Sequence, residues 1–512
     1  MSTVSLSAAS ILRESAIRFA DRPALLAGEA SISYAQLWSE TRAYAGALRE
    51  LGVGPGDPVA VLIPNVPDFV RVYYAVLALG GVVVPVHALL KAEEIEYVLR
   101  DSGARLLVCA HPLLGEGRGG AEQAGVPVVS VMGPDPDADR LEDRAATAAP
   151  LDELVIRDPL DTATIMYTSG TTGTPKGALG SHLSLVEQVT SALLTTLDIR
   201  PDDVVFGGLP LFHTFGQTCT LNTTLRAGAT LVLSPRFEPA GALRTLVERG
   251  CTILMGVPTM YVALLEAAKD DLRRPPLRYA VSGGAAISRA VLERFESVFG
   301  ARVHEGYGLT ETAPVATFNH VGREPRAGSI GTPIWGVDVE IADAETEDRI
   351  DLLPPDSLGE LVIRGHGIMT GYLGRPEATA AAIVDGWFRT GDLGTKDADG
   401  YLWIVDRKKD MIVRNGYNVY PREIEERLTA HPAVADAAVF GVPDDLHGQE
   451  IVAHVVLAAG ASATPEELSD FVRTHLAAYK YPRVIELVDA LPLGPSGKVL
   501  KRELVARHSE SV

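Results

Sequence analysis

The chain has 512 residues, 22% of them charged, and a formal net charge of −20 at pH 7. This length exceeds the usual size of one hydrophobic core and predicts two or more domains. The negative charge argues against binding to nucleic acid or to an anionic membrane, so local basic groups must hold any anionic ligand. The three scattered cysteines, Cys109, Cys219 and Cys251, fit a reducing cytoplasm and lack metal-binding spacing.

Helix and strand signals alternate from the start. Residues 7–19 form an amphipathic pattern without a secretory signal, and Ser33 with Gln36 forms a capping box that opens a helix. Buried strands are expected at residues 58–64 and 106–110. This alternation predicts parallel sheets covered by helices.

Two stretches in this region need separate interpretation. Residues 72–86 are uncharged and apolar, but this run is shorter than the roughly 20 residues that span a bilayer. We expect a buried helix followed by a strand there, and no integral membrane segment. Residues 115–150 are rich in Gly, Ala, Asp and Pro and predict a surface excursion.

A loop rich in Gly and Thr follows the strand-like residues 164–166. Its sequence is Tyr167-Thr-Ser-Gly-Thr-Thr-Gly-Thr-Pro-Lys-Gly177, which offers backbone amides, hydroxyls and the Lys176 ammonium to an anion. The spacing differs from the Walker A pattern, because Pro175 stands where the second glycine belongs. A phosphate-binding loop and a flexible surface loop both remain open at this point.

The rest of the chain predicts two further units. Four more strands are expected at residues 204–206, 230–233, 253–255 and 279–281. Residues 326–405 carry short strands between Gly and Pro turns, which is typical of a small β subdomain. A charged joint at 406–410 leads into a compact α+β unit that ends the chain.

Five more segments carry candidate chemistry. They are residues 209–216 with His213, 282–285, 305–311, 387–392 with Asp392, and 492–498 with Lys498. The second exposes bare backbone to a flat ligand, and the third offers an aromatic face, a hydroxyl and a carboxylate. The fourth offers a carboxylate for ribose hydroxyls. Alone, each is weak, because a lone His is usually a satisfied core residue and a lone Lys is usually solvated.

The order of all six segments resembles the adenylate-forming superfamily of acyl-CoA synthetases, non-ribosomal adenylation domains and luciferases, from about residue 10 to 505. Residues 212–217 and 406–421 are most similar to bacterial fatty acid–CoA ligases. The resemblance implies an α/β fold with a large N-terminal AMP-binding domain at 1–406. That domain would hold two stacked parallel-sheet subdomains and a small β-barrel subdomain at about 326–405. Residues 407–409 would form a hinge, and 410–512 a small mobile α+β lid domain.

The resemblance also implies a reaction in two halves. A carboxylate attacks ATP to give an acyl-adenylate and pyrophosphate, and the thiol of coenzyme A then displaces AMP. The implied catalytic residues are Lys498, Glu311, Thr310 and His213, with Glu311 as the Mg²⁺ ligand. The implied nucleotide-binding residues are Thr168, Ser169, Gly170, Thr171, Thr172, Gly173, Thr174, Lys176, Gly283, Gly284, Ala285, Glu305, Gly306, Tyr307, Gly308, Asp392 and Arg407. Rotation at the hinge residue Lys409 would bring Gly416 to coenzyme A.

The same resemblance places the acyl pocket. Its implied lining is Phe212, His213, Phe215, Gly216, Val257, Met260, Val281 and Gly306. Residues 209–224 contain no acidic side chain that could bind the ammonium group of an amino-acid substrate. They also contain no Lys or Arg that could bind a second substrate carboxylate, because the next basic residue is Arg226. This favours an apolar acid with one carboxylate, such as a medium- or long-chain fatty acid.

Several alternatives stay open. The acid can be an aryl acid of the 4-coumarate type, and the acceptor can be a carrier-protein pantetheine instead of coenzyme A. A non-catalytic acyl or nucleotide binding protein is disfavoured because Glu311 and Lys498 are both present. We expect a cytoplasmic monomer or homodimer. The turn around Lys498 also resembles sites of protein lysine acetyltransferases, which makes Lys498 a candidate for acetylation.

Overall fold

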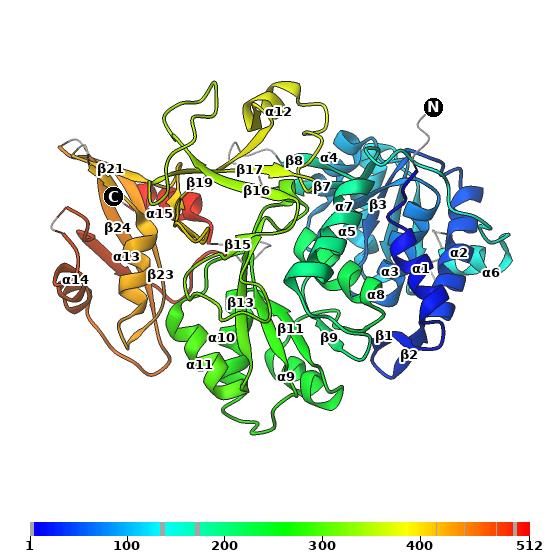
Figure 1. The fold of residues 1–512 in the computed structure, drawn as a ribbon, viewed down its shortest axis with the longest axis horizontal. Coiled ribbons are helices and arrows are strands. Elements are labelled where there is room, and N and C mark those ends of the chain that lie inside the picture. The colour runs from blue at the N-terminus through cyan, green and yellow to red at the C-terminus, as the bar shows by residue number, and fades with distance from the viewer. Residues whose placement is uncertain are drawn as a thin grey trace.

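A computed structural model of the chain describes residues 5–511, apart from 134–138, 169–174, 416, 445, 478 and 495–498. Figure 1 shows the N-terminal elements at one end of the long axis and the C-terminal elements at the other. Two large sheets and a smaller antiparallel sheet precede the C-terminal unit. Among the described residues, no helix combines the length and the apolar character needed to cross a membrane.

A six-stranded sheet lies in the N-terminal part of the molecule. In spatial order its strands are β6 (Val128–Val131), β5 (Leu106–Ala110), β3 (Pro58–Leu62), β4 (Val82–Pro85), β7 (Thr162–Thr168) and β8 (Lys176–Ser181). All neighbours are parallel except β7 and β8, which form an antiparallel pair. The inner strands are buried apolar runs, as expected for a sheet covered on both faces.

A nine-stranded sheet follows it. In spatial order its strands are β15 (Thr332–Pro333), β14 (Thr317–Phe318), β13 (Arg302–Tyr307), β12 (Tyr279–Ser282), β11 (Ile253–Gly256), β9 (Val204–Gly207), β10 (Thr230–Leu233), β1 (Pro23–Ala27) and β2 (Ala30–Ser33). The strands from β13 to β1 in this order are parallel. One apolar cluster contains residues of both large sheets and of α3 (Pro67–Ala78), whose side chains are buried on almost every side.

The remaining helices of this region pack on the two sheets. They are α1 (Ser10–Arg18), α2 (Tyr34–Glu50), α4 (Ala92–Ser102), α5 (Leu114–Ala124), α6 (Leu141–Thr147), α7 (His182–Ser191), α8 (Thr223–Ala227), α9 (Pro239–Glu248), α10 (Pro258–Ala267) and α11 (Arg289–Phe299). The predicted start of α2 is confirmed, because the Ser33 side chain accepts a hydrogen bond from the Gln36 N–H at 3.2 Å. Two π-helical turns also occur, at Ala192–Thr196 and Phe215–Asn222.

The predicted surface excursion at residues 115–150 is wrong. That stretch contains most of α5, β6 and α6, and β6 extends the six-stranded sheet beside β5. Its glycines serve packing: a Cβ at Gly117 would lie 2.6 Å from the Cys109 Sγ, and one at Gly120 would lie 2.7 Å from the Ala92 carbonyl oxygen. The missing side chains therefore let α5 lie close against β5 and α4.

An antiparallel sheet forms the β subdomain. Its strands are β16 (Val337–Ala342), β17 (Gly359–Gly365), β18 (Ile383–Val384), β19 (Trp387–Lys396) and β20 (Leu402–Arg407), with α12 (Pro376–Ala382) beside them. The long central strand β19 pairs with β17, β18 and β20. It therefore brings residues from distant parts of the chain next to the nine-stranded sheet.

The C-terminal unit is an α+β sandwich. It contains the hairpin β21 (Ile412–Arg414) and β22 (Tyr417–Val419), the sheet β23 (Val434–Asp444), β24 (Gly448–Leu457) and β25 (Val484–Leu487), and the helices α13 (Pro421–Thr429), α14 (Pro465–Arg473) and α15 (Lys501–Ser511). Helices α13 and α14 cover one face of the sheet, and α15 covers the other. The observed architecture agrees with the predicted fold class, while the residue numbers of the domain boundaries stay a prediction.

Candidate active site

The parallel strands β11, β12 and β13 end at one edge of the nine-stranded sheet. Ligands bind at the carboxyl ends of the strands in such folds. The residues after these ends approach one another. A Cβ at Gly283 would lie 3.2 Å from the Phe215 ring and 3.5 Å from the Gly306 carbonyl oxygen, and one at Gly284 would lie 3.5 Å from Val257 Cγ1. The structure therefore brings together predicted nucleotide-binding and acyl-pocket residues.

A cluster of three side chains with a buried carboxylate at its centre joins β13, β19 and β20 beside this edge. The Tyr307 hydroxyl donates a hydrogen bond to Asp392 Oδ2 at 2.5 Å, and Arg407 Nε lies 3.1 Å from Asp392 Oδ1. Asp392 and Arg407 are direct partners across β19 and β20. Asp392 is only 3% exposed. Each carboxylate oxygen keeps capacity for a further donor, so this Tyr307–Asp392–Arg407 clamp can still accept a ligand hydroxyl.

The clamp fixes the protonation of its members at neutral pH. Burial, followed by the neighbouring Asp392 charge, raises the pKa of the Tyr307 hydroxyl well above its ordinary value. Burial alone would lower the pKa of Arg407, but Asp392 and Tyr307 outweigh it and the pKa is raised. Tyr307 is thus a neutral donor and Arg407 a cation.

Tyr372 connects two of the predicted site residues. Its hydroxyl donates to Glu311 Oε1 at 2.8 Å, and Lys176 Nζ lies 5.3 Å from the centroid of its ring. Glu311 is 8% exposed and lies in the short 3₁₀ turn Thr310–Thr312. The lysine of the Gly- and Thr-rich loop and the predicted metal-binding carboxylate therefore share one site. Tyr372 was not among the predicted site residues, although its position between Gly371 and Gly374 was a usable signal.

The backbone around Tyr372 explains its position. The Leu179 N–H donates to the Gly371 carbonyl at 2.9 Å, and the Leu373 N–H donates to the Gly177 carbonyl at 2.8 Å, so this segment runs along β8. The Met369 N–H also donates to the Glu311 carbonyl at 2.9 Å. Tyr372 is consequently held over the end of β8 and against the Glu311 turn.

Glu305 lies in β13 beside the C-terminal unit. It is 8% exposed, and burial raises its pKa from 4.5 to about 7. The Gly328 N–H, which donates to Glu305 Oε2 at 3.3 Å, and the Arg422 charge oppose this rise, while Glu426 adds to it. Arg422 and Glu426 belong to α13, so the charge of Glu305 depends on where the C-terminal unit lies.

This arrangement can be compared with known proteins. Residues 12–373 match the AMP-binding enzyme family, and residues 423–498 match the AMP-binding enzyme C-terminal domain. The chain belongs to the AMP-binding enzyme family. This confirms three predictions from the sequence: the resemblance to the adenylate-forming superfamily, the α/β fold class, and the assignment as an acid–thiol ligase.

Relatives of this AMP-binding enzyme share nearly its whole length. A long-chain-fatty-acid–CoA ligase of Bacillus subtilis is 35% identical and covers 98% of this chain and 94% of its own. A feruloyl-CoA synthase of Amycolatopsis is 37% identical and covers 94% of each chain. The ATP-bound crystal structure of MatB from Rhodopseudomonas palustris has a TM-score of 0.89, 31% identity and coverage of 98% of this chain and 99% of its own. The apo structure of that protein has a TM-score of 0.79.

Other predicted residues of the acyl pocket lie in or next to the segments that form this edge of the sheet. Met260 and Val281 are buried, with 5% and 3% exposure. His213 Nδ1 accepts a hydrogen bond from the Phe215 N–H at 3.3 Å. The Phe212 ring centroid lies 4.2 Å from that of His87. A Cβ at Gly216 would lie 2.1 Å from the Pro210 carbonyl oxygen, so a larger residue does not fit there.

A group of polar side chains near this pocket was also missed. Thr214, Gln217 and Thr218 are 5%, 1% and 2% exposed, and their side-chain polar atoms make no hydrogen bond among the described residues. They lie in or just before the π-helical turn that contains Phe215. Buried polar atoms without partners carry a cost that a ligand or a water would remove.

Some predicted residues lie outside the described part of the chain. They are Ser169, Gly170, Thr171, Thr172, Gly173, Thr174, Gly416 and Lys498. The ends of the first loop are described: Thr168 and Lys176 are direct partners across β7 and β8. The assigned roles of all site residues stay predictions.

The predicted hinge follows β20. Lys409 is exposed there, and the preceding Asp406 is 6% exposed. Asp406 Oδ1 accepts from the Arg407 N–H at 2.7 Å, and its Oδ2 accepts from the Arg422 N–H of α13 at 2.9 Å. Asp406 therefore joins the β subdomain to the C-terminal unit in this arrangement.

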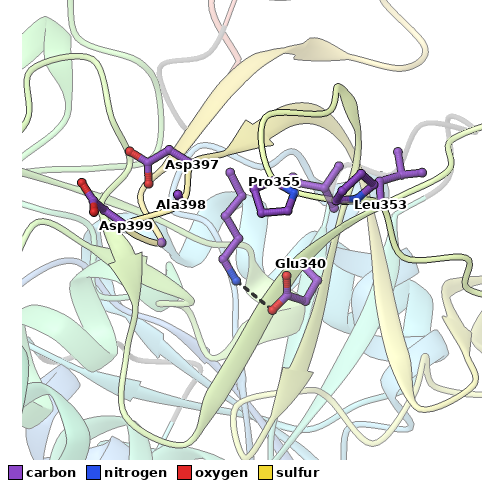
Figure 2. Close-up of a pocket in the computed structure, with 10 residues that line it drawn as sticks. Glu340, Leu353, Pro355, Asp397, Ala398 and Asp399 are labelled. Carbon is purple, nitrogen blue, oxygen red and sulfur yellow. Dashed lines mark hydrogen bonds and ion pairs between the residues drawn. The ribbon is translucent and has the colours of Figure 1, made fainter.

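A surface recess in the β subdomain is separate from this site. It lies between β16 and the turn that follows β19, and Figure 2 shows Glu340 on one side and Asp397 and Asp399 on the other. Lys396 Nζ donates a hydrogen bond to Glu340 Oε1 at 2.7 Å. Its volume is about 340 Å³, and it contains none of the predicted site residues. We therefore place the active site at the strand ends and not in this recess.

Proposed function

We propose that the chain is an ATP-dependent acyl-CoA ligase that activates a carboxylic acid, a medium- or long-chain fatty acid, as an acyl-adenylate and transfers it to coenzyme A. The observation that carries this proposal is the Tyr307–Asp392–Arg407 clamp next to the contacts of Tyr372 with Glu311 and Lys176. The first group suits a nucleoside, and the second suits phosphates with a cation. The fatty-acid ligase of Bacillus subtilis, similar over nearly the full chain, supports the substrate class.

The nucleoside has a defined place in this proposal. Adenine lies between the Tyr307 ring and residues 283–285, because β12 and β13 end side by side there. The ribose hydroxyls donate to Asp392. Since Asp392 is buried under Arg407, the ribose has to share this carboxylate with the guanidinium.

The phosphates and the metal lie toward Glu311. Lys176 and Thr310 bind phosphate oxygens, and Tyr372 orients Glu311 through its hydroxyl. A single buried carboxylate beside phosphates fits Mg²⁺, which prefers hard oxygen ligands and is bound by one or two carboxylates plus substrate phosphates. When bound, Mg²⁺ supplies positive charge that neutralises the phosphates. Positioning and charge neutralisation are the main terms for a reaction between two anions.

The second half-reaction requires a different geometry around the same adenylate. We infer that the C-terminal unit turns at Lys409, so that Lys498 serves adenylation and the region of Gly416 serves thioester formation. The higher TM-score to the ATP-bound than to the apo form of MatB supports the view that the present arrangement belongs to the adenylation half. In this arrangement Asp406 still holds α13.

A second candidate substrate is an aryl acid that carries a hydroxyl or methoxy group. The observation that favours it is the buried amide of Gln217, which makes no hydrogen bond among the described residues and is flanked by the similar Thr214 and Thr218. An alkyl chain leaves these groups unsatisfied, whereas a phenol can pair with them. The similarity to a feruloyl-CoA synthase of Amycolatopsis agrees with this reading.

A panel of acids separates the candidates. Octanoate, palmitate, cinnamate, 4-coumarate and ferulate are each incubated with ATP, Mg²⁺ and coenzyme A, and pyrophosphate and thioester are measured. Thioester formation fastest with the alkyl acids supports the fatty-acid assignment. A preference for 4-coumarate over cinnamate that disappears in Gln217→Leu supports the aryl assignment. Pyrophosphate without thioester indicates a carrier-protein acceptor, and the absence of both with every acid overturns the proposal.

A further inference from the structure

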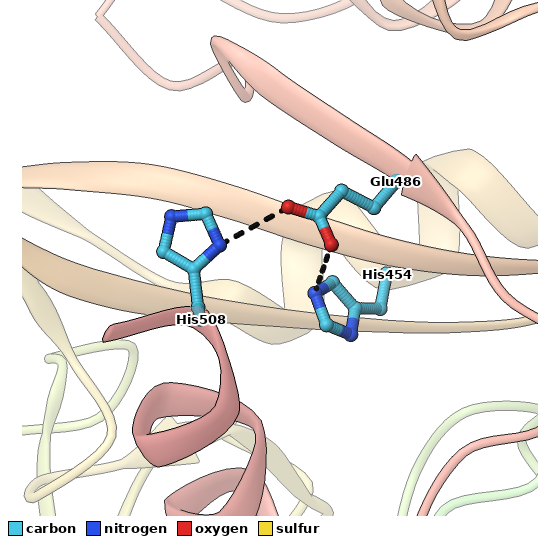
Figure 3. A group of neighbouring side chains, drawn as sticks. All are labelled: His454, Glu486 and His508. Atoms are coloured by element: carbon cyan, nitrogen blue, oxygen red, sulfur yellow. Dashed lines mark hydrogen bonds and ion pairs between the residues drawn. The ribbon is translucent and has the colours of Figure 1, made fainter. Parts of the chain in front are cut away.

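Three side chains of the kinds that bind metal ions meet in the C-terminal unit (Figure 3). His454 lies on β24 and Glu486 on β25, and the two are direct partners across these parallel strands. His508 reaches them from α15. The Glu486 carboxylate lies 3.1 Å from His454 Nε2 and 3.1 Å from His508 Nδ1, and no two of the candidate ligand atoms are more than 4.8 Å apart.

The fold fixes both imidazoles before any ligand binds. The Phe440 ring of β23 packs edge-on against them, with centroid distances of 5.1 Å to His454 and 6.2 Å to His508. Phe440 also belongs to the apolar cluster in which α15 buries Leu504 against the sheet. Packing of this kind holds side-chain rotamers in place, which reduces the entropy lost when a ligand binds.

Burial makes the cluster unlike a solvated surface group. The His454 and His508 side chains are 8% and 12% exposed, and the more open Glu486 side chain gives access from solvent. His454 Nε2 is buried and makes no hydrogen bond of normal geometry among the described residues, although it lies within ion-pair distance of Glu486.

The spacing matches the needs of zinc. Bonds of about 2.0–2.1 Å in a tetrahedron put neighbouring ligand atoms about 3.3 Å apart. Each imidazole already lies 3.1 Å from one oxygen of Glu486, His454 from Oε2 and His508 from Oε1. Binding of zinc through a single oxygen therefore needs one imidazole to move toward it, and this adjustment falls on His508 near the end of α15. Two imidazoles and one carboxylate are a known zinc ligand set that leaves the fourth position to water.

We propose that His454, Glu486 and His508 form a zinc-binding site that joins α15 to the β24–β25 edge of the C-terminal sheet. The ion replaces the direct His454–Glu486 contact with a bond to each of the three ligands. The site also has a structural consequence. Glu486 lies near the end of β25, and His508 lies seven residues after the start of α15 at Lys501, so zinc links these two elements directly.

The test uses the full chain, freed of metal by a chelator and then dialysed. Zn²⁺ is titrated in competition with a chromophoric chelator, and Co²⁺ is titrated in parallel because its visible spectrum reports tetrahedral nitrogen and oxygen ligands. We expect one equivalent of Zn²⁺ to bind. His508→Gln and Glu486→Gln should each weaken binding by about 100-fold or more, since each removes one of three protein ligands. His475→Gln, an exposed histidine of the same unit, should bind as the parent does.

Hydrogen exchange gives a readout that does not depend on activity. Zn²⁺ should slow amide exchange in α15 of the parent and of His475→Gln, but not of His508→Gln. His508 lies near the end of α15, so this variant keeps the test valid if the more buried His454→Gln fails to fold. Equal Zn²⁺ affinity in the parent and in a variant lacking all three ligands overturns the proposal. Failure of the folded parent to bind one equivalent of Zn²⁺ overturns it as well.

Discussion

Replacing Glu305 with glutamine tests the electrostatics of the proposed nucleotide site. Burial raises the pKa of this carboxyl from 4.5 to about 7, against the opposing Gly328 N–H and Arg422. Between these two values the folded protein keeps the proton that the unfolded chain has lost. The folded state therefore binds more protons, and its stability falls as the pH rises through this window.

The size of the effect follows from the same numbers. Each pH unit of the rise in pKa corresponds to about 1.4 kcal/mol, so the full window from 4.5 to about 7 costs about 3 kcal/mol of the free energy of unfolding. Below about pH 4.5 the cost is absent, because both states are protonated, and above about pH 7 it is complete. Glu305→Gln keeps the shape of the side chain and has no proton to lose.

Urea unfolding at a series of pH values measures this directly. The free energy of unfolding of Glu305→Gln, minus that of the parent, should grow by about 3 kcal/mol between about pH 4.5 and pH 7.5. Glu153→Gln, at an exposed glutamate that makes no ion pair among the described residues, is the control, and the growth for Glu305→Gln should clearly exceed that for Glu153→Gln. A flat difference for Glu305→Gln would refute the argument that this carboxyl is buried and protonated.

Three further predictions concern the reaction. Tyr372→Phe removes the hydrogen bond to Glu311, so it should slow acyl-adenylate formation about 10-fold and raise the concentration of Mg²⁺ that the reaction requires. The control variant Tyr401→Phe should change neither. Equal rates for both variants would show that the Tyr372 hydroxyl does not orient Glu311. Lys498→Ala should reduce pyrophosphate release about 1,000-fold and largely spare thioester formation from supplied acyl-adenylate; equal loss in both halves contradicts its assignment. Lys409→Pro should slow one half-reaction and not the other, and unchanged single-turnover rates would remove it as the hinge.

Much of the fold could be predicted because its signals are local. The N-cap at Ser33 appears in the structure, since it depends on residues three positions apart. Apolar runs such as residues 106–110 became buried strands with the expected bounds. Residues 115–150 were misjudged because Gly117 and Gly120 have the composition of a loop, while their actual role is close packing across the fold.

The residues of the candidate site could also be predicted from local signals, whereas the contacts between them could not. Tyr307, Glu311 and Asp392 were found because each lies in a short segment of recognisable chemistry. Their contacts were not predictable, because they depend on which strands become neighbours. The hydrogen bond from Tyr307 to Asp392 joins residues 85 positions apart, and the one from Tyr372 to Glu311 joins residues 61 positions apart. No local pattern encodes pairings of that kind.

The position of Arg407 links nucleotide binding to the movement of the C-terminal unit. Its guanidinium covers Asp392, and it is also the first residue of the predicted hinge, directly after the Asp406 that holds α13. In the proposed function, a ribose that donates to Asp392 shares this carboxylate with the guanidinium. Any displacement of Arg407 then also moves the backbone of the predicted hinge, to which this residue belongs. Because such coupling is reciprocal, the arrangement of the C-terminal unit must in turn alter the affinity for ATP.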